Sequence, residues 1–335
     1  MDQHLNLDEV EDLAFTSLRT AGASELAARS MAKSIRAAER DGIRSHGLMY
    51  LPIYIEHLQC GKVLRAAMPS VSRPRPSAIL VDAGNGFAHP AIDAGWPEFT
   101  AAAQENGIAA MTVTRSYNCG VLGHHAERLA MAGLIGLCMT HAPASIAPVG
   151  GKIPVIGTNP FALAVPDGAG GVAFVIDQSA SVVAKSEVIL KSRKDEPIPE
   201  GWALDSDGNA TTSAEAALKG SMLPSGGYKG FGIGLLVEVL ASALSGAHSS
   251  REASPFSGSL GGPPGTGQCF IAIAPDVYSG TFSSHINALI EDISMQSGAR
   301  VPGSRRRTAR LRTEAQGVLV DAVLMERIAA QLKNN

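Results

Sequence analysis

Short apolar runs alternate with longer helical patterns through the middle of this 335-residue chain, and this alternation limits the folds open to it. Residues 108–113 and 135–140 have the length and apolar character of strands, and residues 123–132 between them have the pattern of a helix. The alternation continues with predicted strands at 161–165, 172–176 and 269–274 and predicted helices at 230–245 and 282–293. Strands and helices in this order predict a layered α/β domain.

The two ends of the chain are helical in pattern. Between residues 7 and 40, apolar residues recur at intervals of three and four, which predicts two amphipathic helices separated by Gly22. Asp8 and Ser24 stand where the N-caps of these helices are expected. Further helices are predicted over residues 45–58 and 319–332.

The chain is longer than one hydrophobic core usually supports, so two interlocked domains are expected. Residues 68–77 are rich in proline and predict a linker or an edge segment at the boundary. We therefore expect a helical domain at residues 1–76, joined by the C-terminal helix at 315–335, and an α/β domain at residues 77–314.

Composition argues against several classes of partner. The formal net charge is −3, so the chain has no general basic field for nucleic acid. The four cysteines are widely spaced and form no CxxC pair, which predicts no metal site and a reducing cytoplasm. The N-terminus lacks the parts of a signal peptide, and no apolar stretch is long enough to cross a bilayer. We expect a cytoplasmic protein with neither a nucleic acid nor a membrane partner.

The sequence Ser45-His46-Gly47 is the first place to look for chemistry. A hydroxyl beside an imidazole supplies a titratable proton donor and a group that can orient it, and the glycine leaves room for a substrate. Three further clusters of glycine and hydroxyl residues follow, at 157–160 (Gly-Thr-Asn-Pro), 177–181 (Asp-Gln-Ser-Ala-Ser) and 226–230 (Gly-Gly-Tyr-Lys-Gly). One such pattern is weak, but the ordered set indicates an enzyme.

These motifs, with Pro199-Glu200-Gly201-Trp202-Ala203, resemble the malate/L-lactate dehydrogenase-like family of NAD(P)-dependent oxidoreductases. The resemblance spans about residues 7–332 and is strongest to the sulfolactate dehydrogenase and Δ1-piperideine-2-carboxylate/Δ1-pyrroline-2-carboxylate reductase branches. It implies a non-Rossmann NAD(P)-binding α/β domain with a mixed sheet, plus a helical domain built from both termini. The absence of a GxGxxG turn after any predicted strand agrees with a non-Rossmann fold.

By resemblance, four segments hold NADP or NAD. Glycines let the backbone approach the pyrophosphate, hydroxyls donate hydrogen bonds, and the basic residues supply positive charge. The implied cofactor residues are Asn118, Cys119, Gly120, Val121, Leu122, Asp177, Gln178, Ser179, Ala180, Ser181, Tyr228, Lys229, Gly303, Arg305, Arg306 and Arg307. For the arginine run the alternative is a solvated turn, and for Cys119 it is a buried small apolar side chain.

The same resemblance assigns the catalytic roles. His46 is the proton donor, because its ordinary pKa near 6.5 allows it to deliver a proton and to be protonated again. Ser45 and an acidic group orient the imidazole in the imino acid reductases of the family, and the acid aligns with Glu187. Glu187 could also be an ordinary surface carboxylate beside Lys185 and Lys191.

The substrate contacts depart from the family. Most relatives have an arginine three residues after the motif glycine that binds the substrate carboxylate, and here that position is Tyr50. A phenol has one neutral donor where a guanidinium has a charged fork. Either Arg44 or Arg115 comes into reach, or the substrate differs. Thr158 is expected to touch the substrate, and it also suits a turn.

The leading hypothesis is an NAD(P)H-dependent reductase that transfers a hydride to C2 of a small 2-oxo acid or cyclic 2-imino acid. A second is a 2-hydroxy acid dehydrogenase of the malate, lactate or sulfolactate type. A third, of another class, is a catalytically silent relative that binds a metabolite or nucleotide. The resemblance also implies a homodimer whose active sites are each completed by the partner chain.

Overall fold

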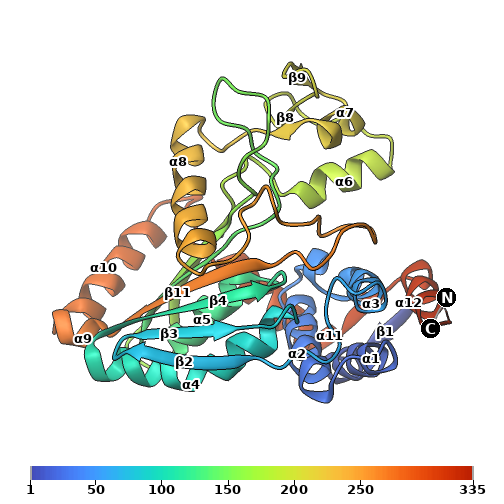
Figure 1. Cartoon of the computed structure of the whole chain (residues 1–335). Coiled ribbons are helices and arrows are strands. Elements are labelled where there is room, and N and C mark those ends of the chain that lie inside the picture. Colours follow the sequence, from blue (N-terminus) through green and yellow to red (C-terminus); the bar gives the residue numbers. More distant parts are fainter. Residues whose placement is uncertain (1, 334–335) are drawn as a thin grey trace.

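The computed structural model describes residues 2–333 and is built around a seven-stranded sheet in the order β2-β3-β4-β11-β5-β6-β7 (Figure 1). The strands β3 and β4 run parallel, and every other neighbouring pair is antiparallel, so the sheet is mixed. The strands are β2 (Ser70–Arg75), β3 (Ala78–Asp82), β4 (Ile108–Ser116), β5 (Ile135–Thr140), β6 (Phe161–Pro166), β7 (Val172–Gln178) and β11 (Thr266–Ile273). The proline-rich segment is therefore an edge strand, where missing N–H donors are tolerated.

Helices cover both faces of this sheet. The helix α4 (Ala88–Asn106) connects the parallel pair β3 and β4, and α5 (Leu122–Met131) packs on β5 and β6. Alternate residues of β11 point to opposite faces. Phe270 joins the core with α4 and α5, whereas Cys269 joins a smaller core with the segment η3 (Glu238–Ala243).

A helical layer is formed by both ends of the chain. The helices α1 (Leu7–Thr20), α2 (Glu25–Arg40), α3 (Leu51–Gln59) and α12 (Ala322–Lys333) lie together in Figure 1, and β1 (Gln3–Leu5) pairs with β12 (Val318–Val320). Buried side chains of the first helices and of residues 318–328 share one core. The division into domains at residue 76 stays a prediction. The last two residues of the predicted C-terminal helix, 334 and 335, lie outside the described part of the chain.

Three sequence predictions about this layer need correction. Asn6, not Asp8, caps α1, because its side chain accepts the amides of Asp8 and Glu9 in a capping box. The third helix begins at Leu51 rather than at residue 45, after two short 3-10 turns at 44–46 and 48–50. The last predicted helix splits into β12 and α12, because β1 supplies a partner strand that local pattern cannot reveal.

A small third layer was not anticipated. Residues 203–222 contain a three-stranded sheet of β8 (Ala203–Leu204), β9 (Ala210–Thr211) and β10 (Ser221–Met222), flanked by α6 (Lys185–Arg193) and α7 (Ala214–Lys219). Its own core includes Ile146, Ile156 and Val188. These strands have two residues each, too few to give a periodic signal.

The remaining helices differ in part from expectation. The predicted helix at 230–245 is α8 (Tyr228–Val237) followed by η3, which is a π-helix. After α9 (Pro275–Tyr278) and α10 (Phe282–Ser294) comes α11 (Ser304–Gln316), so the run Arg305 to Arg307 lies in the first turn of a helix. Across residues 2–333, no helix combines the length and the apolar character needed to cross a membrane.

Replacement of Phe270 by alanine should lower the free energy of unfolding by about 3–5 kcal/mol. The Phe270 side chain is fully buried on the central strand, and its ring contacts Trp96 and His125 at centroid distances of 6.4 and 5.7 Å. Urea denaturation monitored by circular dichroism measures the change. The control is Leu80→Ala on β3, where the side chain is 45% exposed and the loss should stay below about 1 kcal/mol. Equal losses would contradict the assignment of this core.

Candidate active site

The segment that carries His46 is fixed by a buried carboxylate on the preceding helix. Glu39 Oε1 accepts the backbone amide of Leu48 at 2.7 Å. A Cβ on Gly47 would lie 2.2 Å from the same oxygen, so only glycine lets the chain pass this close. Burial raises the pKa of Glu39. The motif glycine therefore serves the packing of the turn as well as any substrate.

Ser45 and His46 form the contact that the sequence predicts. Ser45 Oγ lies 3.0 Å from His46 Nδ1. Burial lowers the pKa of His46 from its usual 6.5, and the negative charge of Asp177 opposes this effect, while His124 and Arg306 add to it. The acidic group that favours the charged imidazole in this chain is thus Asp177.

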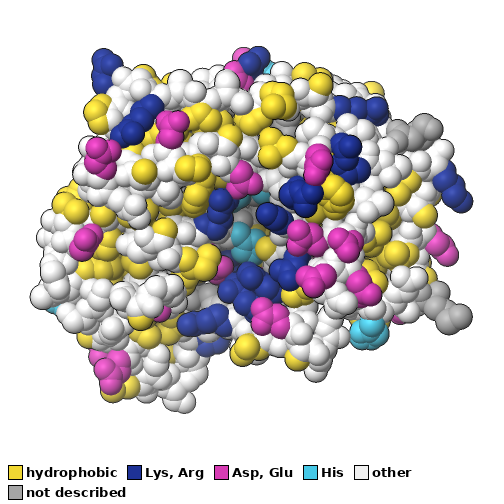
Figure 2. Space-filling view, turned by 90° about the horizontal axis from the view of Figure 1, so that it is seen from below, with side chains coloured by type: hydrophobic (Ala, Val, Ile, Leu, Met, Phe, Trp, Pro, Cys, Tyr) yellow, Lys and Arg dark blue, Asp and Glu magenta, His cyan; other side chains and the backbone are white. Residues whose placement is uncertain are grey.

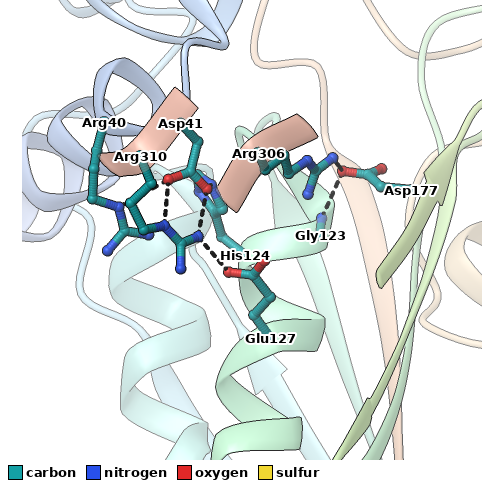
Figure 3. A network of polar contacts seen from close by, with 8 residues as sticks. All are labelled: Arg40, Asp41, Gly123, His124, Glu127, Asp177, Arg306 and Arg310. Atoms are coloured by element: carbon teal, nitrogen blue, oxygen red, sulfur yellow. Dashed lines mark hydrogen bonds and ion pairs between the residues drawn. The ribbon is translucent and has the colours of Figure 1, made fainter. Parts of the chain in front are cut away.

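Asp177 joins two elements that also face His46. It lies near the end of β7, and its Oδ2 accepts the backbone amide of Gly123 at 3.0 Å and Arg306 Nη2 at 2.5 Å (Figure 3). Gly123 belongs to the first turn of α5 and Arg306 to the first turn of α11. Asp177 was predicted as a cofactor residue, and the structure also makes it the bridge between these helices.

A second carboxylate, that of Asp41, joins the same two helices, α5 and α11. The Asp41 side chain is fully buried and accepts His124 Nε2 at 3.1 Å, Arg310 Nε at 3.0 Å and Arg40 Nε at 2.9 Å (Figure 3). Arg310 also binds Glu127 at 3.1 Å. Burial alone would raise the pKa of Asp41, but these hydrogen bonds outweigh it and hold the pKa well below its usual range.

The residues around Asp177 and Arg306 fit the phosphates of a dinucleotide. A cavity of about 250 Å³ is lined by Val175, Asp177 and residues 300–306, three of them arginines. Arg306 Nη1 is buried without a hydrogen-bond partner, and a Cβ on Gly123 would lie 2.2 Å from it. Figure 2 shows histidine at the bottom of a hollow ringed by lysine and arginine side chains. An unpaired guanidinium donor beside a helix N-terminus suits an anion.

Two other predicted cofactor segments are backbone turns held by internal hydrogen bonds. Gly120 N donates to Asn118 Oδ1 at 3.3 Å, which closes the loop before α5. Burial raises the pKa of Cys119 to about 12, so its thiol is not a nucleophile. The loop of residues 177–181 is tied to the Gly-Thr-Asn-Pro turn, because Ala180 N donates to Thr158 O at 2.8 Å.

The Tyr50 hydroxyl is already committed within the protein. Tyr50 donates to the carbonyl oxygen of Phe256 at 3.2 Å, and Asn118 Nδ2 lies 3.5 Å from the same hydroxyl. Burial raises the pKa of Tyr50 to about 12, so the phenol stays neutral. Tyr50 therefore offers a substrate carboxylate neither a charge nor a free proton.

The two alternative cations differ in availability. Arg115 is engaged by Asp82, since its Nε lies 2.9 and 3.1 Å from the two carboxylate oxygens. The Arg44 guanidinium is exposed and makes no hydrogen bond or ion pair with any residue in 2–333. Arg44 is thus the one of the two without a hydrogen-bonded carboxylate, and it lines a cavity with Glu39, Gly42 and residues 312–313 and 316–319.

Several predicted site residues are not brought together with His46 in the single chain. Glu187 is exposed on α6, and its carboxylate has no hydrogen bond or ion pair among the described residues. Tyr228 and Lys229 are exposed at the start of α8, and Arg307 is exposed on α11. The expected contact of Glu187 with Ser45 and His46 is therefore absent, and its catalytic role stays a prediction.

Some residues of this site escaped the sequence reasoning. Glu39, Asp41, His124 and Arg310 belong to no motif, and the pair of Asp41 with Arg310 joins residues 269 positions apart. A signal was present at Asp41, an acidic residue at the C-terminal end of a helix, where the helix dipole disfavours negative charge. Such a residue needs a tertiary partner.

Comparison with known proteins gives one consistent result. A family model described as malate/L-lactate dehydrogenase matches residues 5–329. The chain is 40% identical over 326 residues to a (2R)-3-sulfolactate dehydrogenase (NADP(+)) of Chromohalobacter salexigens, covering 97% of each. It is also 40% identical over 330 residues to a Δ1-pyrroline-2-carboxylate reductase of Ancylobacter novellus, covering 97% of this chain and 96% of the relative.

Solved structures agree with the sequence relatives. The Δ1-piperideine-2-carboxylate reductase of Pseudomonas syringae superposes with a TM-score of 0.92 at 32% identity, covering 98% of this chain and 99% of the other. The sulfolactate dehydrogenase of Methanocaldococcus jannaschii superposes with a TM-score of 0.89 at 25% identity, covering 99% and 97%.

Replacement of Asp41 by asparagine should lower the free energy of unfolding at pH 7 by about 3 kcal/mol, because Arg40 and Arg310 lose the buried carboxylate that they share. A depressed pKa means that Asp41 stabilises the fold above the unfolded pKa of about 3.9 and loses this effect as the pH falls through its folded value. The difference between wild type and variant should therefore shrink below about pH 4. Urea denaturation between pH 7 and pH 3 measures it.

The matched control is Asp93→Asn. Asp93 also links two helices, through Ser30 on α2 and Arg128 on α5, but its side chain is 42% exposed. Its loss should cost less than about 1 kcal/mol. The same loss in both variants, or a difference that does not change with pH, would show that Asp41 is not a buried anchor.

Proposed function

This chain belongs to the malate/L-lactate dehydrogenase family, and on that premise we propose that it reduces a small 2-oxo acid or cyclic 2-imino acid at C2, with His46 as the proton donor. The chain is an NAD(P)-dependent oxidoreductase with the mixed-sheet α/β fold of this family, as its motifs predicted. What the proposal adds is the substrate class and the roles of individual residues.

The observation that carries the proposal is the contact of Ser45 Oγ with His46 Nδ1 at 3.0 Å, at a place where the negative charge of Asp177 raises the pKa of the imidazole. NAD(P)H, when bound, supplies the hydride. His46 holds the proton for the oxygen or nitrogen that gains negative charge, and Ser45 fixes the orientation of the imidazole. Asp177 stabilises the imidazolium before transfer. Glu187 can contribute only if a second copy of the chain brings α6 to this site.

The relatives favour the cyclic imine over the open-chain acid. Several curated relatives at 36–40% identity are named Δ1-pyrroline-2-carboxylate reductases.

Arg44 is the proposed carboxylate ligand, because Tyr50 is neutral and Arg115 is engaged elsewhere. The half-buried ring of Tyr50, which packs on the buried ring of Tyr54 at 4.8 Å, suits a substrate with ring methylenes. The three arginines of the 250 Å³ cavity favour NADPH, whose 2′-phosphate adds negative charge.

The 2-hydroxy acid reading keeps the same cofactor and the same proton carrier. It is supported by the sulfolactate dehydrogenase relative. The reverse reaction needs a neutral imidazole as base, and burial lowers the pKa of His46, which keeps it neutral at pH 7. We hold this as the second candidate.

A catalytically silent, ligand-binding relative remains the third reading. The neutral Tyr50 is the observation that favours it, because a bound acid would lack the expected cation. The Ser45–His46 contact speaks against it.

A homodimer is part of the proposal. α8, η3 and the residue after η3 expose apolar side chains at 40–60%, namely Ile233, Leu235, Leu236, Val239 and Leu244. An exposed apolar patch of this kind marks a protein interface. The free cysteines, three of them buried, suit the reducing cytoplasm that we propose as the location.

The first test of the function follows NADPH and NADH oxidation with Δ1-pyrroline-2-carboxylate, Δ1-piperideine-2-carboxylate, pyruvate, oxaloacetate and sulfopyruvate. We expect the highest kcat/KM with a cyclic imine and NADPH. In His46→Gln, kcat should fall at least about 100-fold, because the general acid is lost, while NADPH binding measured by fluorescence stays within about threefold. His285→Gln, an exposed histidine on α10, is the control and should keep full activity.

Each outcome separates the three readings. Activity with open-chain acids alone would overturn the imine preference and support the hydroxy acid enzyme. NADPH binding without turnover of any substrate would support the silent relative. Full activity in His46→Gln would exclude His46 as the proton donor.

Sedimentation equilibrium should give about twice the 34.7 kDa mass of one chain. Leu236→Glu on the exposed face of α8 should shift the protein toward the monomer and lower its activity, because a charge in an apolar interface is costly to bury. Lys219→Glu, an exposed change on α7, is the control. A fully active species with the mass of a single chain would refute the dimer.

A further inference from the structure

Asn159 holds the Gly-Thr-Asn-Pro turn in a backbone conformation that few residues adopt. Its φ is 38°, in the left-handed region, and the residue is fully buried. Its Oδ1 accepts Ala142 N at 3.2 Å, and its Nδ2 donates to Gly234 O at 2.9 Å and to Glu238 Oε2 at 2.8 Å. Strained residues of this kind persist only where the surroundings over-determine them, and they cluster at functional sites.

Glu238 reaches the turn by a second path as well. Its Oε1 accepts Ser250 N at 2.8 Å, and its Oε2 accepts Ser250 Oγ at 2.6 Å. Ser250 Oγ in turn accepts the backbone amide of Gly157 at 3.1 Å. Glu238 is the first residue of the π-helical segment η3, a form of helix that is often found at functional sites. One carboxylate therefore anchors both Gly157 and Asn159.

The Glu238 carboxylate is held by neutral donors. Within residues 2–333 it makes no ion pair, and its contacts are the three donors on Asn159 and Ser250. Burial lowers the pKa of the neighbouring His141, and His141 Nδ1 accepts Gly267 N at 3.2 Å, so this imidazole is neutral. Hydrogen bonds to an ionised acceptor are about twice as strong as neutral ones. A neutral amide could not accept all three.

The turn of residues 157–160 has little room to take another backbone conformation if the contacts of Glu238 are lost. A Cβ on Gly157 would lie 2.1 Å from Ala142 O, so the backbone is already at contact distance. The carbonyl oxygen of Thr158 accepts Ala180 N at 2.8 Å and thereby fixes the loop of residues 177–181, which includes Asp177. The position of Glu238 is thus transmitted to two segments of the site.

We propose that Glu238 is a positioning residue of the active site, which holds Thr158 and the loop of residues 177–181 where the substrate meets them. It touches neither substrate nor cofactor and acts through Asn159 and Ser250. This inference rests on the proposed function for the role of Thr158, and it extends that function by a residue that lies in none of the sequence motifs.

The test is Glu238→Gln, assayed on the acid or imine that the wild type reduces best. We expect KM for that substrate to rise about tenfold with kcat within about twofold, since a displaced turn weakens ground state and transition state alike. The matched control is Glu252→Gln. Glu252 accepts Ser249 N at 2.9 Å and Ser249 Oγ at 2.8 Å in the same manner, but it is exposed and makes no hydrogen bond to Ser250 or to residues 157–160. Its KM should not change.

A second measurement does not depend on activity. In the ligand-free protein, hydrogen exchange at the amides of Gly157 and Ala180 should accelerate at least about tenfold in Glu238→Gln, while exchange in β5 stays unchanged. Unchanged exchange and unchanged KM would overturn the proposal. Faster exchange in an enzyme with no turnover on any substrate would retain the anchor and refute the proposed function instead.

A second variant, Ser250→Ala, tests the proposal even if Glu238→Gln does not fold. Ser250→Ala removes only the path to Gly157 and keeps the contact of Glu238 with Asn159. We expect a smaller rise in KM in the same direction. If Ser250→Ala leaves KM and exchange at wild-type values while Glu238→Gln unfolds the protein, Glu238 is a stabilising residue and the proposal fails.

Discussion

Two carboxylates set the geometry of the active site, because each accepts hydrogen bonds from both α5 and α11 (Figure 3). A buried charge costs several kcal/mol unless it is paired, so Asp41 and Asp177 compel the two helices to converge. On α11 the partners Arg306 and Arg310 lie one helical turn apart and share a face. These pairs hold α11 against α5 and the end of β7.

The proton carrier depends on this frame. Asp41 precedes His46 by five residues, and Glu39 fixes the backbone at Leu48, two residues after His46. The chain can therefore hold His46 near Asp177 without a direct hydrogen bond to a carboxylate. The pKa of His46 results from burial, which lowers it, and from Asp177, which raises it. An anion that binds Arg306 would weaken one of the opposing positive charges and favour the protonated form.

The substrate side is built differently from the cofactor side. Backbone turns form it, held by neutral donors around Glu238, and the ring of Tyr50 adds apolar surface. Where the family places a cation, Tyr50 donates its proton to Phe256 O and so braces the loop that follows Ser250. In the proposed function, Tyr50 contacts the substrate ring and Arg44 binds the substrate carboxylate.

The sequence by itself determined the family, the mixed α/β fold, most strands of the sheet and the Ser45–His46 pair, because these depend on local periodicity and on contiguous motifs. Only the tertiary structure decided which acid raises the pKa of His46, that Arg306 lies on a helix, and that the Tyr50 hydroxyl donates to the carbonyl oxygen of Phe256. It also showed the edge pairing of β1 with β12 and the anchoring of Asn159 by Glu238. Such contacts join residues up to hundreds of positions apart. No local pattern encodes them, since burial and charge pairing are settled only when the segments meet.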